Sequence, residues 1–126
     1  MLALGVHPHF LATCLLGVLA QRLVRTLCGN CKSLVELSGA TRVFDDIKPW
    51  LELDEGKELF APYGCEDCHH QGYSGQTGVF EILKASDMIR QYVFEGRSTR
   101  EIHDKAVDEG MLTLRESALL KAAQGI

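Results

Sequence analysis

The chain contains two Cys-x-x-Cys pairs, Cys28 with Cys31 and Cys65 with Cys68, and this pattern constrains the fold more than any other feature. Each pair can present two thiolates from one tight turn, and two such turns brought together form a four-sulfur tetrahedron. Zn2+ favours that geometry, because its filled d shell imposes no preference of its own. The intervening segment, residues 32–64, is longer than the usual finger spacing, so we expect it to carry its own secondary structure. We predict that the four cysteines bind one structural zinc ion.

Other interpretations of the cysteines stay open at this stage. An iron–sulfur cluster also accepts four thiolates, and spacing alone does not distinguish it from zinc. A thiol oxidoreductase needs one reactive pair beside a strand–helix unit, and neither pair has such a context. Disulfides suit secreted chains, for which there is little other sign here. His69 and His70 follow Cys68 directly and could replace a thiolate, although exposed positions outside the ligand set are commoner.

The length and charge limit the classes of protein. With 126 residues, the chain forms one domain or two very small ones. Its net charge of −4 disfavours a main role on nucleic acid, which requires a basic face. A core of this size gains from a metal crosslink, since structural zinc contributes on the order of 10 kcal/mol to folding.

The first part of the chain is strongly apolar. Phe10–Ala20 is too short to span a bilayer and lacks the early positive charge of a signal peptide, so a buried helix is favoured over a cleaved leader. The apolar residues recur at helical spacing from Pro8 to Leu27, which predicts one long helix ending near Cys28. Cys14 lies in this run and is expected to be a small buried hydrophobe. An exposed Phe10–Leu19 face on this helix would allow a homodimer.

The remaining segments carry clear local signals. We expect a short amphipathic helix over about Thr41–Trp50, with Val43, Phe44 and Ile47 on one face, and a short strand over Leu59–Ala61. A glycine-rich turn over residues 72–78 should precede a strand at Val79–Leu83. Three helices should follow: one capped by Ser86 or Asp87, one opened by the Ser98–Glu101 capping box, and one opened by Thr113–Glu116.

Catalytic motifs are missing from the sequence. It has no glycine-rich phosphate loop followed by lysine, and no hydrolase nucleophile elbow, so we do not expect the chain alone to be an enzyme. Arg22 and Arg25 are three residues apart on the expected helix. A solvated polar face is the simpler interpretation, and contact with a nucleotide phosphate or a neighbouring subunit is the functional one.

The chain resembles the secretion ATPases of type II secretion and type IV pilus assembly. The resemblance is carried by the following stretches: Gly5–Pro8 (GVHP), Leu15–Cys28 (LLGVLAQRLVRTLC) with Cys31, the second cysteine pair with Gly72–Glu81 (GYSGQTGVFE), Gly110–Leu114 (GMLTL), and Gln124–Gly125. It extends over nearly the whole chain. One departure is Gln76, where the family commonly has arginine.

The resemblance implies a C-terminal piece of a hexameric motor. Such ATPases bind ATP and Mg2+ through Walker motifs that this chain lacks, so the activity would reside in the parent alone. The implied partners are the other subunits of the hexamer and inner-membrane platform proteins, with no nucleic acid. The implied location is cytoplasmic, peripheral to the inner membrane through partners. The rival hypothesis is a free-standing zinc-ribbon-like module for protein or nucleic acid.

Together these arguments predict an α+β fold: a small zinc-stapled domain with a long N-terminal helix, short strands around the tetracysteine site and a C-terminal helical subdomain. The expected division is residues 1–27 as a remnant helix of the RecA-like ATPase core, residues 28–72 as the zinc subdomain, and residues 73–126 as a strand with the helical subdomain.

Overall fold

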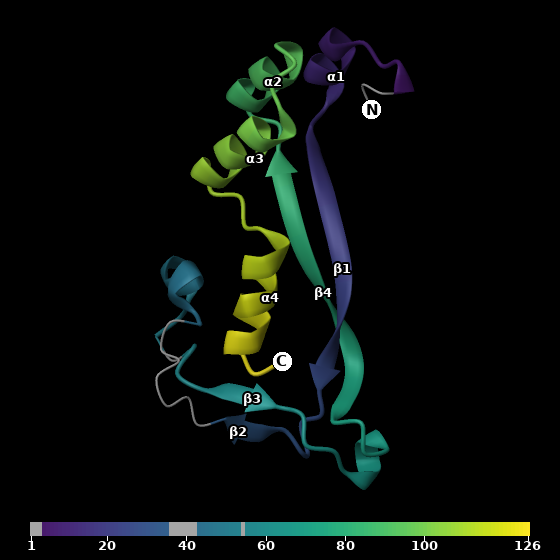
Figure 1. Ribbon diagram of the computed structural model, residues 1–126, viewed down its shortest axis with the longest axis vertical. Helices are drawn as coiled ribbons and strands as arrows, with labels where there is room; N and C mark the ends of the chain where they lie inside the picture. Colours follow the sequence, from purple (N-terminus) through teal and green to yellow (C-terminus); the bar gives the residue numbers. More distant parts are fainter. Residues whose placement is uncertain (1–3, 36–42, 54) are drawn as a thin grey trace. The chain divides into compact units, whose positions relative to one another are not determined.

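The computed structural model describes residues 4–35, 43–53 and 55–126, and it confirms the α+β class (Figure 1). The elements in chain order are α1 (Pro8–Cys14), β1 (Gly17–Leu27), β2 (Ser33–Val35), the 3-10 helix η2 (Asp45–Trp50), β3 (Leu59–Ala61), the 3-10 helix η3 (Glu66–Cys68), β4 (Tyr73–Lys84), α2 (Asp87–Phe94), α3 (Thr99–Asp108) and α4 (Leu114–Ala123). None of the helices in the described ranges is long and apolar enough to cross a membrane.

The chain divides into two compact units, described separately below. The helical unit contains Met1–Ala20 and Phe80–Thr113, and the cysteine unit contains Gln21–Val79 and Leu114–Ile126. β1 and β4 each contribute residues to both units. These two strands pair in a two-stranded sheet, and their arrows in Figure 1 run in opposite directions.

The long N-terminal helix was the main error of the sequence-based prediction. α1 ends at Cys14, because Leu15 adopts extended backbone angles (φ −70°, ψ 122°), and β1 begins at Gly17. Glycine and the β-branched Val18, Val24 and Thr26 weaken a helix, and pairing with β4 supplies the backbone partners that a strand requires. Cys14 is exposed at the end of α1, so its predicted burial was also wrong.

The helical unit has a small apolar core between α2, α3 and the segment after α3. Ile89 is fully buried, and Ala106 and Met111 are nearly so, with Leu83 and Ile102 packed against them. Arg90 links α2 to α1: its Nη1 donates to the carbonyl of Ala12 at 2.8 Å. The cation thereby satisfies a carbonyl at the C-terminal end of α1, where helix carbonyls lack partners within the helix.

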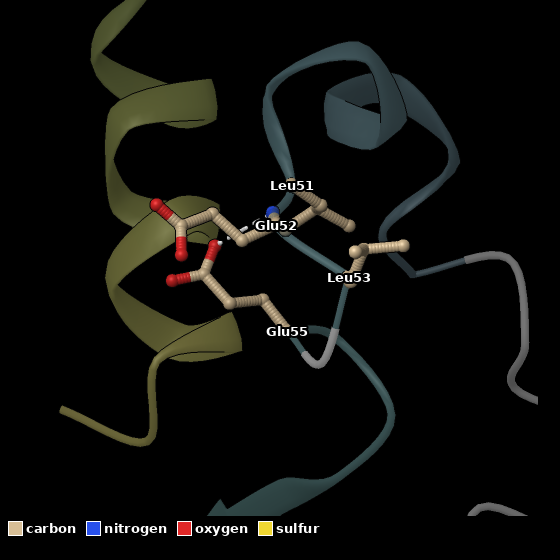
Figure 2. Close-up of a pocket in the computed structure, with 4 residues that line it drawn as sticks. All are labelled: Leu51, Glu52, Leu53 and Glu55. Atoms are coloured by element: carbon tan, nitrogen blue, oxygen red, sulfur yellow. Dashed lines mark hydrogen bonds between the residues drawn. The ribbon is translucent and has the colours of Figure 1, made fainter.

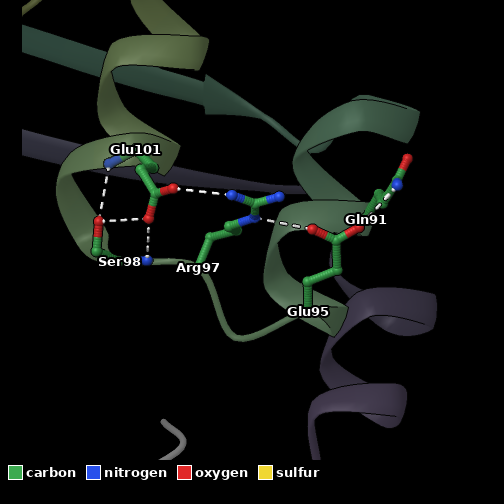
Figure 3. Close-up of polar contacts among 5 residues, drawn as sticks. All are labelled: Gln91, Glu95, Arg97, Ser98 and Glu101. Carbon is green, nitrogen blue, oxygen red and sulfur yellow. Dashed lines mark hydrogen bonds and ion pairs between the residues drawn. The ribbon is translucent and has the colours of Figure 1, made fainter.

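The turn between α2 and α3 is fixed by side-chain hydrogen bonds (Figure 3). Ser98 caps α3: its Oγ accepts from the Glu101 amide at 3.3 Å, and the Glu101 carboxylate accepts from the Ser98 amide at 2.9 Å. Arg97 donates to Glu95 at 2.8 Å and to Glu101 at 3.1 Å. The predicted capping box at Ser98 and the predicted cap at Ser86 are both confirmed.

Replacing Ser98 by alanine is expected to destabilise the chain by about 1 kcal/mol, because the first turn of α3 loses a donor and an acceptor. The midpoint of urea unfolding, followed by helical circular dichroism, measures this change. Ser74→Ala, at an exposed position of β4, is the control and should change the midpoint much less.

The same cap gives the stability a pH dependence. The Ser98 hydroxyl and then the Ser98 amide, together with Arg97, hold the pKa of Glu101 below its ordinary value. The stabilisation is therefore fully present above the ordinary pKa and is lost as the pH falls through the lowered one. Lowering the pH should therefore reduce the urea midpoint of Ser98→Ala less than that of the parent chain. An equal reduction in both chains would contradict this account.

In the cysteine unit, β2 and β3 form an antiparallel pair with Leu34 opposite Phe60. β3 has the bounds predicted from the sequence. The expected amphipathic helix is a shorter 3-10 helix, η2. Ile47 within it and Phe44 directly before it are buried, and Val43 is partly buried; Thr41 lies outside the described residues. α4 packs against η2 and β3, as Figure 1 shows, and Arg115 of α4 pairs with Asp46.

The predicted glycine-rich turn before β4 was wrong. The strand begins at Tyr73, so Gly75 and Gly78 lie within it, and it continues through the expected Val79–Leu83 segment to Lys84. The sequence signal was ambiguous because glycine also occurs in strands at irregular positions, and Gly75 has a φ of +87°.

Candidate metal centre

Two tight turns carry the four cysteines. The first turn follows β1, and the amides of Cys31 and Lys32 both donate to the Cys28 carbonyl, at 3.2 and 2.9 Å. The second turn contains η3 and closes where the His70 amide donates to the Cys65 carbonyl at 2.8 Å. The Cys28 amide also donates to the Gly72 carbonyl at 3.0 Å, which ties the two turns together through the backbone.

The four sulfur atoms lie within 4.8 Å of one another. The Sγ–Sγ distances are 3.9 Å for Cys28 and Cys65, 3.7 Å for Cys31 and Cys68, and 3.8 Å for Cys65 and Cys68. A regular tetrahedron with zinc–sulfur bonds of about 2.3 Å has edges of about 3.8 Å. A disulfide would instead bring two sulfurs to about 2.05 Å, and all four cysteines are free. The arrangement therefore fits a four-thiolate metal site.

Backbone amides point at two of the sulfurs. Gly64 donates to Cys31 Sγ at 3.3 Å, while Cys65 and Gly72 each donate to Cys68 Sγ at 3.2 Å. The amide donors, that of Cys65 first, lower the pKa of Cys68 to about 6, whereas burial raises the pKa of Cys31 to about 12. Donors of this kind stabilise thiolate, which is the form that binds metal.

The cysteine side chains are largely shielded from solvent, and a side-chain hydrogen bond joins the two turns. Cys28 and Cys68 are buried, and Cys31 and Cys65 are partly buried. Asn30 donates to Asp67 at 2.9 Å, which joins the middle of one turn to the middle of the other. Four protein sulfurs would fill the tetrahedral shell of a bound zinc ion and leave no position for water or substrate.

The structure also places the two histidines. Within the described residues, the close cluster of metal-binding atoms consists of the four cysteines, and both His69 and His70 are exposed. Both have positive φ values of 50° and 59°, in the left-handed region. Their backbone conformation turns the chain sharply after Cys68, so that the Gly72 amide reaches the Cys68 sulfur.

Sequence reasoning missed the residues that shape this site. Gly64 and Gly72, with φ of +106° and +76°, supply the amides described above, and Asn30 with Asp67 supplies the link between turns. The available signal was a glycine directly before Cys65 and another four residues after Cys68, because a close backbone approach often requires glycine.

Arg22 and Arg25 do not share a helix face. Both are exposed on β1, where a separation of three residues directs side chains to opposite faces of the strand. The guanidinium of Arg25 lies 3.8 Å from the centre of the Tyr73 ring, a cation–π contact next to the second turn.

A separate shallow pocket of about 460 Å3 is lined by Leu51, Glu52, Leu53 and Glu55 (Figure 2). Its two carboxylates do not form a free acid–base pair: Glu55 accepts from the Glu52 amide at 3.3 Å and from Gln124 at 3.1 Å. We attribute to Glu55 the structural role of holding its loop against the end of α4.

The chain is thus a small α+β protein with two Cys-x-x-Cys turns whose four sulfurs all lie within 4.8 Å of one another. The family comparison is more specific. A family model described as "Type II/IV secretion system protein" matches residues 1–126, and the chain belongs to this family. The resemblance inferred from the sequence is thus confirmed.

Curated relatives agree with this assignment. The chain is 37% identical to "Type II secretion system protein E" of Dickeya dadantii, over 98% of this chain and 23% of that protein. It is 39% identical to "Type IV pilus assembly ATPase PilB" of Thermus thermophilus, over 98% of this chain and 14% of that protein. It is 37% identical to "Type II secretion system ATPase E" of Vibrio cholerae, over 98% of this chain and 24% of that protein. The chain therefore spans less than a quarter of the length of these relatives.

Proposed function

We propose that Cys28, Cys31, Cys65 and Cys68 bind one Zn2+ ion, and that this ion has a structural role. The observation that carries the proposal is the clustering of the four sulfurs, which all lie within 4.8 Å of one another, with three pairs at the 3.7–3.9 Å expected for a zinc tetrahedron. The ion would crosslink the turn after β1 to the turn before β4. Both turns lie in the cysteine unit, where few large side chains are buried among the described residues, so that the unit would gain from such a crosslink.

We further propose that the chain serves as the metal-binding part of a secretion or pilus assembly motor. Relatives named as ATPases of type II secretion and type IV pilus assembly support this, and the chain matches only a minor share of their length. ATP and Mg2+ would bind elsewhere in the parent, because this sequence has no Walker A motif. The chain would transmit motion between subunits of a hexamer and inner-membrane platform proteins, on the cytoplasmic side.

Three earlier predictions continue as proposals. Residues 1–27 would belong to the ATPase core of the parent, although as a short helix with a strand and not as one long helix. Arg22 would be the better candidate for a nucleotide or subunit contact, since Arg25 is engaged with Tyr73. The isolated chain would pair through its exposed apolar residues, which include Phe10 at 65% and Leu16 at 82% exposure.

Metal analysis with thiol titration tests the zinc proposal. The purified chain is expected to hold one zinc per molecule, with one thiol reactive before chelation and five after it, because Cys14 alone is exposed. Cys14→Ser is the matched control: it should remove the early reactive thiol and leave the zinc content unchanged. Iron with its visible absorption, or five thiols reactive from the start without bound metal, would contradict a zinc site.

A further inference from the structure

The side chain of Lys32 connects the cysteine site to the end of α4. Lys32 directly follows Cys31, and its amide donates to the Cys28 carbonyl at 2.9 Å, so the first cysteine turn fixes its backbone. Its Nζ donates to the carbonyl of Gly125 at 2.7 Å. The same ammonium lies 4.7 Å from the centre of the Phe60 ring on β3. One side chain thus contacts both β3 and the C-terminal segment.

The C-terminal segment is shaped to receive this ammonium. Gly125 is buried and has a φ of +71°, and a Cβ built on it would lie 3.1 Å from Lys32 Nζ and 3.2 Å from the Phe60 ring. Two neighbouring contacts reinforce the position: the Gly56 amide donates to the Ala123 carbonyl at 3.4 Å, and Gln124 donates to Glu55. The Gly125 carbonyl lies two residues beyond the end of α4 at Ala123, where the negative end of the helix dipole attracts a cation.

We propose that Lys32 couples the four-cysteine site to α4, so that metal binding holds the C-terminal helix against β3. This inference depends on the proposed metal site. With metal bound, the first cysteine turn is rigid and the Lys32 ammonium is presented to Gly125 at a fixed position. Without metal, the turn loses its crosslink and Lys32 becomes mobile, which removes the contact between its ammonium and the Gly125 carbonyl. The metal site would then control whether α4 is docked or released.

Hydrogen exchange at the amides of α4, residues 114–123, tests the coupling in the purified chain. Chelation is expected to lower the protection of these amides at least about tenfold, the size expected for loss of one charge-assisted hydrogen bond. Lys32→Met should cause a similar loss while the zinc content stays at one per chain. Lys32→Arg keeps a donor and should retain more protection. Lys48→Met is the matched control, because Lys48 pairs with Asp45 on the surface of η2.

The outcomes separate this inference from the metal proposal. If the parent chain binds no metal, both fail. If it binds zinc but α4 keeps its protection after chelation, or in Lys32→Met with zinc bound, the coupling alone is refuted. If Lys32→Met loses zinc, the test is made on Lys32→Arg with zinc bound. Retained protection of the α4 amides in that variant supports the coupling, and loss of protection refutes it.

Discussion

Replacing Cys68 by serine is expected to abolish zinc binding and to unfold the cysteine unit. All four sulfurs lie within 4.8 Å of one another, and in the proposed site they are the four zinc ligands, so losing one thiolate would leave three ligands and an unfilled position. Structural zinc contributes on the order of 10 kcal/mol, which is comparable to the whole stability of a small domain. Cys68 is also the sulfur that receives two backbone amides, at 3.2 Å each, and serine is too short to receive both.

Trp50 offers a specific probe for this result. It is the only tryptophan of the chain and lies in η2, which packs against α4 within the cysteine unit. Its fluorescence should change in Cys68→Ser, and in the parent chain after treatment with a strong chelator. Cys14→Ser, at the exposed fifth cysteine of the helical unit, should behave as the parent. A Cys68→Ser chain with unchanged fluorescence and a cooperative unfolding transition would refute the structural role of the metal.

Replacing Gly72 by alanine is expected to cost about 2–5 kcal/mol of stability. A residue with a Cβ is strained at φ +76°, by about 1–2 kcal/mol. In addition, the new Cβ would lie 2.5 Å from Pro62 Cβ and 3.1 Å from Pro62 Cα, so the backbone must shift, at a further cost of about 1–3 kcal/mol. The shift would carry the Gly72 amide away from Cys68 Sγ and the Gly72 carbonyl away from the Cys28 amide.

Gly75→Ala is the matched control for this change. Gly75 also has a positive φ, of +87°, but a Cβ there meets no atom within 4 Å. It should therefore lose only the conformational part, about 1–2 kcal/mol. Urea unfolding in saturating zinc gives both values, and competition with a chelator gives the zinc affinity, which should fall in Gly72→Ala alone. If Gly72→Ala and Gly75→Ala lost equal stability and equal zinc affinity, the close approach of residue 72 to Pro62 and its hydrogen bond to Cys68 Sγ would have no measurable effect.

Local chemistry explains the elements that could be predicted. Ser86 and Ser98 cap helices through hydrogen bonds to amides three residues ahead, so the signal and the structure that it specifies lie in the same few residues. Residues 59–61 were recognised as a strand from their composition. The two cysteine pairs predicted a common site, because two Cys-x-x-Cys turns brought together can offer four thiolates to one ion.

The secondary structure of the segment after α1 could not be predicted from the sequence. Leu15–Leu27 has apolar residues at spacings that fit a helix, and its β-branched residues fit a strand equally well. Its state is decided by β4, which lies almost fifty residues further along and supplies the backbone partners. The burial of Cys14 was misjudged for the same reason, since it rested on a helix that ends at that residue.

Short stretches of neighbouring residues specify the two cysteine pairs, the capped starts of α2 and α3, and the family, so the amino-acid pattern was sufficient to predict these features. Three other features became visible only in three dimensions: residues 17–27 form a strand, Gly64 and Gly72 direct amides at sulfur, and Lys32 contacts Gly125. Those features depend on contacts between segments distant in the chain. Their geometry is fixed by backbone pairing and packing, which no local pattern of residue types specifies.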